Sequence, residues 1–174
     1  MAGRPRCRID IRHGSLFDVQ AAAAVNPANS LGAMAGGVAG ALKRVAGQAV
    51  EDEARRHAPI PVGQAIVTSG GRSRFPAIIH APTMPSPGMA IPVDHVRLAI
   101  RAALQIAEAN GFDSLAIPGM GTGVGGVPPA EAAAAMIEEI HAFDAHRLRC
   151  VTLIDIDAGL VEAWRQVADH TASS

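Results

Sequence analysis

Two glycine-rich segments of this chain have the composition of loops that hold an anion with backbone amides. The first runs from Asn26 through Gly36-Gly37-Val38 to Gly40, and the second from Gly119 to Pro128. Glycine lets backbone N–H groups approach an anion closely, and successive amides can form a concave nest for phosphate oxygens. Two such loops facing each other suit a diphosphate better than a monophosphate. Neither contains lysine or arginine, so binding would depend on backbone amides and helix dipoles.

Taken alone, such glycines are also typical of close backbone packing or of a helix cap. Neither segment matches the usual dinucleotide fingerprint or the G-K-[ST] of a P-loop. Side chains that could act as a general base are few. Lys43 lies one helical turn beyond Ala39 but is more typical of a solvated helix surface. His80, within an apolar run, is more typical of a hydrogen-bonded core histidine, and His13 is far from the expected chemistry.

Strands that alternate with helices are predicted to position both segments. The strands are expected at residues 7–12, 19–25, 64–69, 77–81, 114–118 and 150–156, and an ordered loop at 82–92. A helix is expected after Gly37, with Val38, Leu42, Val45 and Ala49 on its inward face and Glu51 outside that face. Further helices are expected at 93–110, at 129–143 and around Trp164. The alternation predicts an α/β sandwich around a mainly buried sheet, with ligands at the carboxyl ends of its strands.

Length and composition limit the class of protein. The chain of 174 residues fits a single domain, with a core over about residues 6–168 and short flexible ends. Aromatic residues make up 3%, so few rings are available to stack on a base. A net charge of −1 and the lack of a long basic run disfavour nucleic-acid binding.

The same composition bears on location and on metals. No apolar run is long enough to cross a bilayer, and no signal sequence follows Arg4 and Arg6, which predicts a cytoplasmic protein without membrane association. No CxxC or His/Cys cluster indicates a metal site, and no cofactor is expected. The oligomeric state is left open.

The two segments together resemble the macrodomain signature. The likeness rests on Val25-Asn26-Pro27-Ala28-Asn29-Ser30, on Gly36-Gly37-Val38-Ala39-Gly40-Ala41-Leu42, on Ile117 through Gly126, and on Ile78-Ile79-His80 as a supporting strand. It extends from about Gly14 to Trp164 and points to small stand-alone prokaryotic members. It implies a three-layer α/β/α sandwich around a mixed, largely parallel six-stranded sheet. It also implies a pocket for ADP-ribose or an ADP-ribosylated protein.

The resemblance further implies ligand contacts. Asn29 would hydrogen-bond the distal ribose and is the one catalytic candidate, with an Asx turn as the structural alternative. Amides of Gly36, Gly37 and Val38 would hold the distal ribose and one phosphate. The second segment would wrap the diphosphate with Gly121, Thr122, Gly123, Val124, Gly125 and Gly126.

The adenine end departs from the family pattern. It would lie near Ser15, Leu16 and Ile156, where other members commonly carry an aspartate in place of Ser15 and an aromatic ring in place of Ile156. Asp18, three residues beyond Ser15, is expected to point elsewhere. Adenine selectivity is therefore expected to be weaker than is usual in the family.

Both binders and hydrolases occur in the family, and the sequence leaves both readings open. The best-known hydrolase pattern has an aspartate where this chain has Ala39. Some relatives without that acid are thought to use a water held by the substrate's own phosphate, while the asparagine orients the sugar. We expect an ADP-ribose-binding module. The alternatives are a slow hydrolase of ADP-ribosyl or O-acyl-ADP-ribose groups, or a different nucleotide-binding α/β protein.

Overall fold

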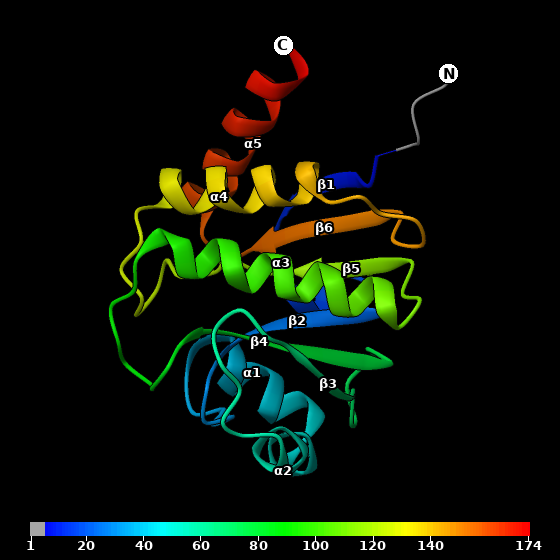
Figure 1. Ribbon diagram of the computed structural model, residues 1–174, viewed down its shortest axis with the longest axis vertical. Helices are drawn as coiled ribbons and strands as arrows, with labels where there is room; N and C mark the ends of the chain where they lie inside the picture. The colour runs from blue at the N-terminus through cyan, green and yellow to red at the C-terminus, as the bar shows by residue number, and fades with distance from the viewer. Residues whose placement is uncertain (1–5) are drawn as a thin grey trace.

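A computed structural model describes residues 6–174, in which six strands form one sheet with helices on both faces (Figure 1). The strands are β1 (Arg8–His13), β2 (Ala23–Asn29), β3 (Ile66–Ser69), β4 (Ala77–Met84), β5 (Ser114–Ile117) and β6 (Cys150–Asp155). The helices are α1 (Gly37–Ala46), α2 (Gln48–Arg56), α3 (Val93–Ala109), α4 (Pro129–Ala142) and α5 (Ala158–Ala172), with a 3-10 turn, η1, at Leu16–Asp18. The predicted α/β sandwich around a mixed sheet is confirmed.

The order of the strands brings the two glycine-rich segments together. The order is β1-β6-β5-β2-β4-β3, and every neighbouring pair is parallel except β3 with β4. β2 and β5, which precede the two segments, are central neighbours, with Ala23 opposite Leu115. The chain continues from β2 toward β4 and from β5 toward β6, in opposite directions along the sheet. The carboxyl ends of β2 and β5 therefore flank a topological switch point, where open α/β sheets bind ligands.

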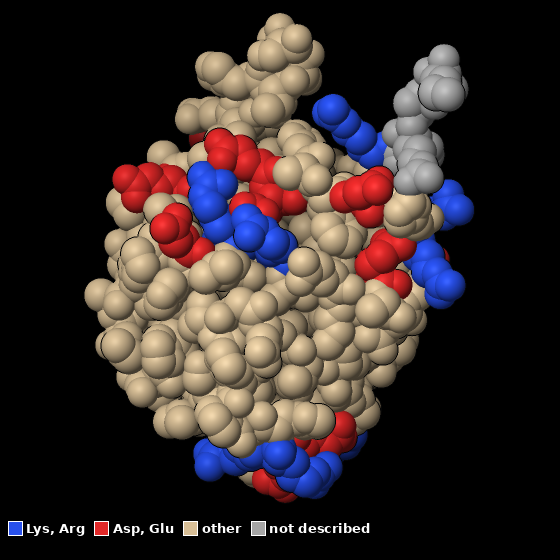
Figure 2. Space-filling view, viewed as in Figure 1, with Lys and Arg blue, Asp and Glu red and all other residues tan. Residues whose placement is uncertain are grey.

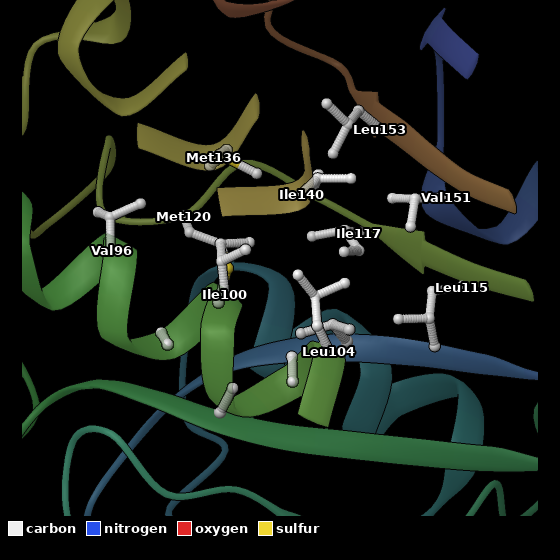
Figure 3. Close-up of a cluster of buried hydrophobic side chains, with 14 of the residues drawn as sticks. Val96, Ile100, Leu104, Leu115, Ile117, Met120, Met136, Ile140, Val151 and Leu153 are labelled. Atoms are coloured by element: carbon white, nitrogen blue, oxygen red, sulfur yellow. The ribbon is translucent and has the colours of Figure 1, made fainter. Parts of the chain in front are cut away.

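Two apolar layers hold the helices on the sheet. The larger lies under α3, α4 and α5, where Ile100 and Leu104 of α3 meet Met136 and Ile140 of α4 above β5 and β6 (Figure 3). The smaller lies under α1 and η1 and includes Leu42, Val50, Phe75 and Ile78. Met120, just after β5, is fully buried in the larger layer. The base of the second glycine-rich segment is thus held by apolar packing.

The predicted helix after Gly37 is broken in two. Gly47 has a φ of +103°, a left-handed conformation that favours glycine, and it separates α1 from α2. Ala46 and Val50 are buried, whereas Val45 and Ala49, predicted to face inward, are exposed. The prediction assumed one straight axis, and a change of axis moves the buried stripe.

Two central strands extend further than predicted. β2 begins at Ala23 and continues through Asn26 to Asn29, so the asparagine motif lies within the strand. β4 continues through Pro82 to Met84, although the sequence favours a loop from that proline. β3 pairs with β4 only as far as His80, so at Pro82 no ladder hydrogen bond to β3 is lost.

Charged side chains gather at two ends of the face shown in Figure 2, with acidic and basic groups intermixed. Arg97 pairs with Glu138 at 2.8 Å, and Arg101 with Glu139 at 2.8 Å. This face therefore carries no continuous basic surface of the kind that binds nucleic acid. Across residues 6–174, none of the helices combines the length and the apolar character that crossing a bilayer needs.

Candidate functional site

Loops that follow the five parallel strands meet at one edge of the sheet, at the left of Figure 1. The first glycine loop, defined here as residues 30–38, joins β2 to the first turn of α1. The second glycine loop, residues 118–128, joins β5 to α4. Because β1, β4 and β6 run parallel to β2 and β5, residues 14–16, 85–92 and 156–157 begin at the same edge. The predicted site residues are therefore brought to one side of the molecule.

The first glycine loop ends in an uncapped helix N-terminus. Gly36 is the N-cap residue of α1, with an extended backbone and no side-chain cap. Within residues 6–174, the amides of Gly36, Gly37 and Val38 donate to no protein acceptor. A Cβ built on Gly36 or Gly37 would have no neighbouring heavy atom within 4 Å, and Gly37 has a φ of +58°. The loop thus presents unpaired amides beside open space.

The second glycine loop shows the same features. The N–H of Val127 donates to the carbonyl of Gly121 at 2.9 Å and closes the loop. In the described part of the chain, the amides of Thr122, Gly123, Val124 and Gly125 have no acceptor. Open space surrounds the Cβ positions of Gly123 and Gly126, and no side chain caps the start of α4. Each glycine loop therefore ends at a helix with free N–H groups.

Gly121 and Gly125, both predicted to contact the ligand, are needed for packing. A Cβ at Gly121 would lie 2.6 Å from Cγ2 of Val96, and one at Gly125 would lie 2.7 Å from the carbonyl oxygen of Gly121. The carbonyl of Gly125 also accepts from the N–H of Ile91 at 2.9 Å. These two glycines bring the loop close to α3 and to residues 85–92, while Gly123 and Gly126 leave its outer side open.

The Asn29 side chain is engaged with its own loop. Its Nδ2 donates to the carbonyl of Ala33 at 3.0 Å, and its Oδ1 accepts from the N–H of Leu31 at 3.0 Å. The Asx turn considered as the alternative role is formed. One amide hydrogen and one lone pair of the side chain remain for a ligand.

Residues predicted at the adenine end also serve the fold. Ser15 Oγ accepts from the N–H of Phe17 at 3.2 Å and caps η1, and Leu16 is buried in the smaller apolar layer. Ile156 is 77% exposed. Asp18 is the last residue of η1, and its Oδ2 lies 3.8 Å from the position that a Cβ on Gly14 would take.

Two carboxylates that the sequence analysis did not single out hold the glycine loops. Asp155, the last residue of β6, accepts from the N–H of Gly119 at 2.9 Å and from that of Asp157 at 2.9 Å. Glu51 of α2 accepts from the N–H of Met34 at 2.7 Å. An acidic residue at the end of an apolar strand was a usable signal for Asp155. No local signal indicates Glu51, since its contact depends on how α2 packs against the first loop.

A family model describing the Macro domain matches residues 25–136, a range that holds both glycine loops. The chain belongs to the macrodomain family. An unrelated nucleotide-binding α/β protein is therefore set aside as an alternative.

Similar proteins are found both among known sequences and among solved structures. An uncharacterised protein of Aquifex aeolicus is 52% identical over 159 residues, which cover 91% of this chain and 96% of the relative. A Citrobacter rodentium protein named O-acetyl-ADP-ribose deacetylase is 35% identical over 146 residues, covering 80% of this chain and 82% of the relative. The crystal structure of the Trypanosoma brucei macrodomain in complex with ADP-ribose has a TM-score of 0.84 and 26% identity, covering 92% of this chain and 69% of that one.

The macrodomain has a buried chain of polar side chains across β2, β4 and β3. Oγ1 of Thr68 donates to the carbonyl of Ser69 at 3.0 Å and lies 2.9 Å from Nε2 of His80. Nε2 therefore carries the ring proton, and Nδ1 accepts from Nδ2 of Asn26 at 3.1 Å. Burial lowers the pKa of His80 to about 4, although the charge of Glu53 opposes this. His80 is thus a neutral core histidine, as predicted, and Asn26 is hydrogen-bonded to it within the fold.

This buried histidine makes stability depend on pH. The unfolded chain protonates His80 near its ordinary pKa of 6.5, whereas the folded protein resists protonation down to about 4. Stability is therefore fully present above pH 6.5 and is lost as the pH falls toward 4, by up to about 3 kcal/mol. Urea unfolding at pH 7, 5.5 and 4.5 measures the loss. His80→Gln should show a flatter pH dependence, and an equal slope in both proteins would contradict the assignment.

A metal site is not evident in the described macrodomain residues, where no three His, Cys, Asp or Glu side chains gather closely enough to hold an ion.

Proposed function

We propose that this macrodomain binds ADP-ribose, or the ADP-ribosyl group of a modified protein in the cytoplasm, across the carboxyl ends of β2 and β5. The observation that carries the proposal is the pairing of two amide-rich loops on neighbouring strands, with open space over Gly36, Gly37, Gly123 and Gly126. Free N–H groups at two uncapped helix N-termini suit the two phosphates of a diphosphate. The Trypanosoma brucei complex with ADP-ribose, at 26% identity, supports the same ligand.

The distal ribose of the ligand would lie at the first glycine loop, and its adenine would lie toward β1 and β6. Amides of Gly36, Gly37 and Val38 would hold the distal ribose and one phosphate, and the remaining amide hydrogen and lone pair of Asn29 would bind the ribose. The second glycine loop would wrap the diphosphate. Adenine would lie toward β1 and β6, near Ser15 and Leu16, where the exposed side chain of Ile156 could cover the base. Residues 1–174 would act as a single domain.

Calorimetric titration tests the proposal. ADP-ribose should bind more tightly than ribose 5-phosphate, because a single phosphate can engage only part of the two loops. NAD and ATP serve as comparison ligands that carry the same adenine. If ADP-ribose binds no better than ribose 5-phosphate, the diphosphate site is not where we place it.

Asn29→Ala should raise the dissociation constant for ADP-ribose about tenfold, because the lost hydrogen bonds to a ribose hydroxyl are worth about 1.4 kcal/mol. The same change removes the Asx turn, so unfolding by urea must be measured alongside the calorimetry. Ser30→Ala provides a control, since its Oγ makes one long bond, 3.5 Å, to the carbonyl of Met84. An unchanged affinity in folded Asn29→Ala would remove the asparagine from the site.

A slow hydrolase is the second candidate, favoured by the relative named O-acetyl-ADP-ribose deacetylase. Ala39 offers no acid or base in the first turn of α1, and Lys43 pairs with Glu51 at 3.1 Å. Hydrolysis would then use a water held by the ligand's phosphate, with Asn29 orienting the ribose. Incubation with O-acetyl-ADP-ribose and with mono-ADP-ribosylated protein separates a binder from a hydrolase. Activity that survives Asn29→Ala would exclude this mechanism.

A further inference from the structure

The buried side chain of Glu51 anchors the first glycine loop through a backbone amide of the loop. Met34, at its middle, is 1% exposed, and its N–H donates to Oε2 of Glu51 at 2.7 Å. Before Met34, the loop is tied by Asn29 and by the N–H of Ser30, which donates to the carbonyl of Met84 at 2.9 Å. After Met34, no amide in residues 35–38 donates to any acceptor in the described chain. The hydrogen bond to Glu51 is therefore the last N–H anchor before the amides that face open space.

Glu51 is held as a carboxylate by groups on its other oxygen. Oε1 accepts from Nε2 of Gln48 at 2.9 Å and from Nζ of Lys43 at 3.1 Å, with Nε of Arg55 at 3.6 Å. Burial alone would raise the pKa of Glu51, but the hydrogen bonds from Gln48, from the Met34 amide and from Lys43 outweigh it and lower the pKa. The bond to Met34 is thus charge-assisted, which is the stronger kind.

The break at Gly47 makes this arrangement possible. Lys43 lies in the last turns of α1, whereas Gln48 and Glu51 lie in the first turn of α2. Because the chain changes direction at a φ of +103°, the start of α2 faces the first loop, and the Glu51 side chain reaches Met34 while remaining paired with Lys43.

We propose that Glu51 is a positioning residue that sets the affinity for the diphosphate without contacting the ligand. The proposal rests on the proposed function, since the amides of Gly36, Gly37 and Val38 matter only if they bind phosphate and ribose. A loop held in its binding geometry before the ligand arrives loses less conformational freedom on binding. Glu51 therefore contributes to affinity through the Met34 amide, and Lys43 contributes by keeping Glu51 in place.

Glu51→Gln tests the proposal because it conserves shape. An amide replaces one acceptor oxygen by a donor, so in either orientation an NH₂ group faces the Met34 amide or the Lys43 and Gln48 donors. The dissociation constant for ADP-ribose should rise about tenfold. In hydrogen exchange, a peptide covering residues 30–38 should exchange faster. Lys43→Gln removes the single lysine of the chain but leaves the carboxylate, so a rise of about two- to threefold is expected.

Glu53→Gln is a matched control on the same helix. The Glu53 carboxylate accepts from the N–H and Oγ of Ser69 at 3.0 and 2.8 Å, which lower its pKa, but it touches neither glycine loop. It should therefore lower the urea midpoint without changing affinity by more than about twofold. Affinity is compared only among variants with native circular dichroism. If Glu51→Gln does not fold, Lys43→Gln and the same hydrogen-exchange measurement decide.

The possible outcomes are distinct. Wild type that binds ADP-ribose, with affinity lost in Glu51→Gln and kept in Glu53→Gln, supports the positioning role. Wild type that binds, with equal affinity in Glu51→Gln or equal losses in both variants, overturns that role and leaves the proposed function intact. Wild type that does not bind ADP-ribose overturns both.

Discussion

Gly123→Val is expected to weaken ADP-ribose binding by about 100-fold or more while changing the free energy of unfolding by no more than about 1 kcal/mol. A Cβ at Gly123 would meet no heavy atom within 4 Å, and Gly123 is not among the glycines with positive φ. The backbone therefore tolerates valine. The branched side chain would instead occupy the space into which the neighbouring free amides open, and would keep a diphosphate out.

Calorimetry and urea unfolding on the same preparations measure both parts of this expectation. Gly123→Ala should fall between wild type and Gly123→Val, because a methyl group fills less of the space. Ala109→Val is the control, since Ala109 is exposed at the end of α3 away from the carboxyl edge of the sheet. Wild-type affinity in Gly123→Val would mean that the outer side of the second loop does not face the ligand.

Gly121→Ala is expected to have the opposite character, with a loss of about 3 kcal/mol in the free energy of unfolding. Gly121 has a φ of +79°, and a left-handed backbone alone costs an alanine about 1–2 kcal/mol. Its Cβ would also lie 2.6 Å from Cγ2 of Val96, which is fully buried in the larger apolar layer and has no room to move. The methyl group must displace α3 or open the loop.

A double-mutant cycle separates the two causes. Val96→Ala removes the contacting methyl groups, so Gly121→Ala should cost less in that background, while the backbone strain remains. Urea midpoints of the four proteins give the coupling. If Gly121→Ala alone changes the free energy of unfolding by less than about 1 kcal/mol, the loop does not pack against Val96 of α3 as described here.

These two glycines show where inference from sequence stops. The sequence indicates a glycine-rich anion loop but does not distinguish a glycine that leaves space for a ligand from one that lets two segments of chain pack closely. Gly121 and Gly123 are the same type of residue, two positions apart in the chain. Only their surroundings, open space in one case and Val96 in the other, assign their roles.

Features that depend on local pattern were predicted well. Each of the six strands found was expected within a few residues, because apolar runs bounded by turn residues are local signals. His80 was expected as a core histidine because an apolar run surrounds it. The errors came from tertiary geometry. The break at Gly47 moved the inward stripe from Val45 and Ala49 to Ala46 and Val50.

The sequence by itself determined the alternation of strands and helices, the two glycine loops and the family that carries them, because each is written in residues close together along the chain. Only the tertiary structure decided which strands are neighbours, which loop amides remain unpaired, and that Glu51 and Asp155 hold the two loops. Those contacts join residues far apart in the chain, so their formation depends on how helices pack on the sheet. No local periodicity records that packing.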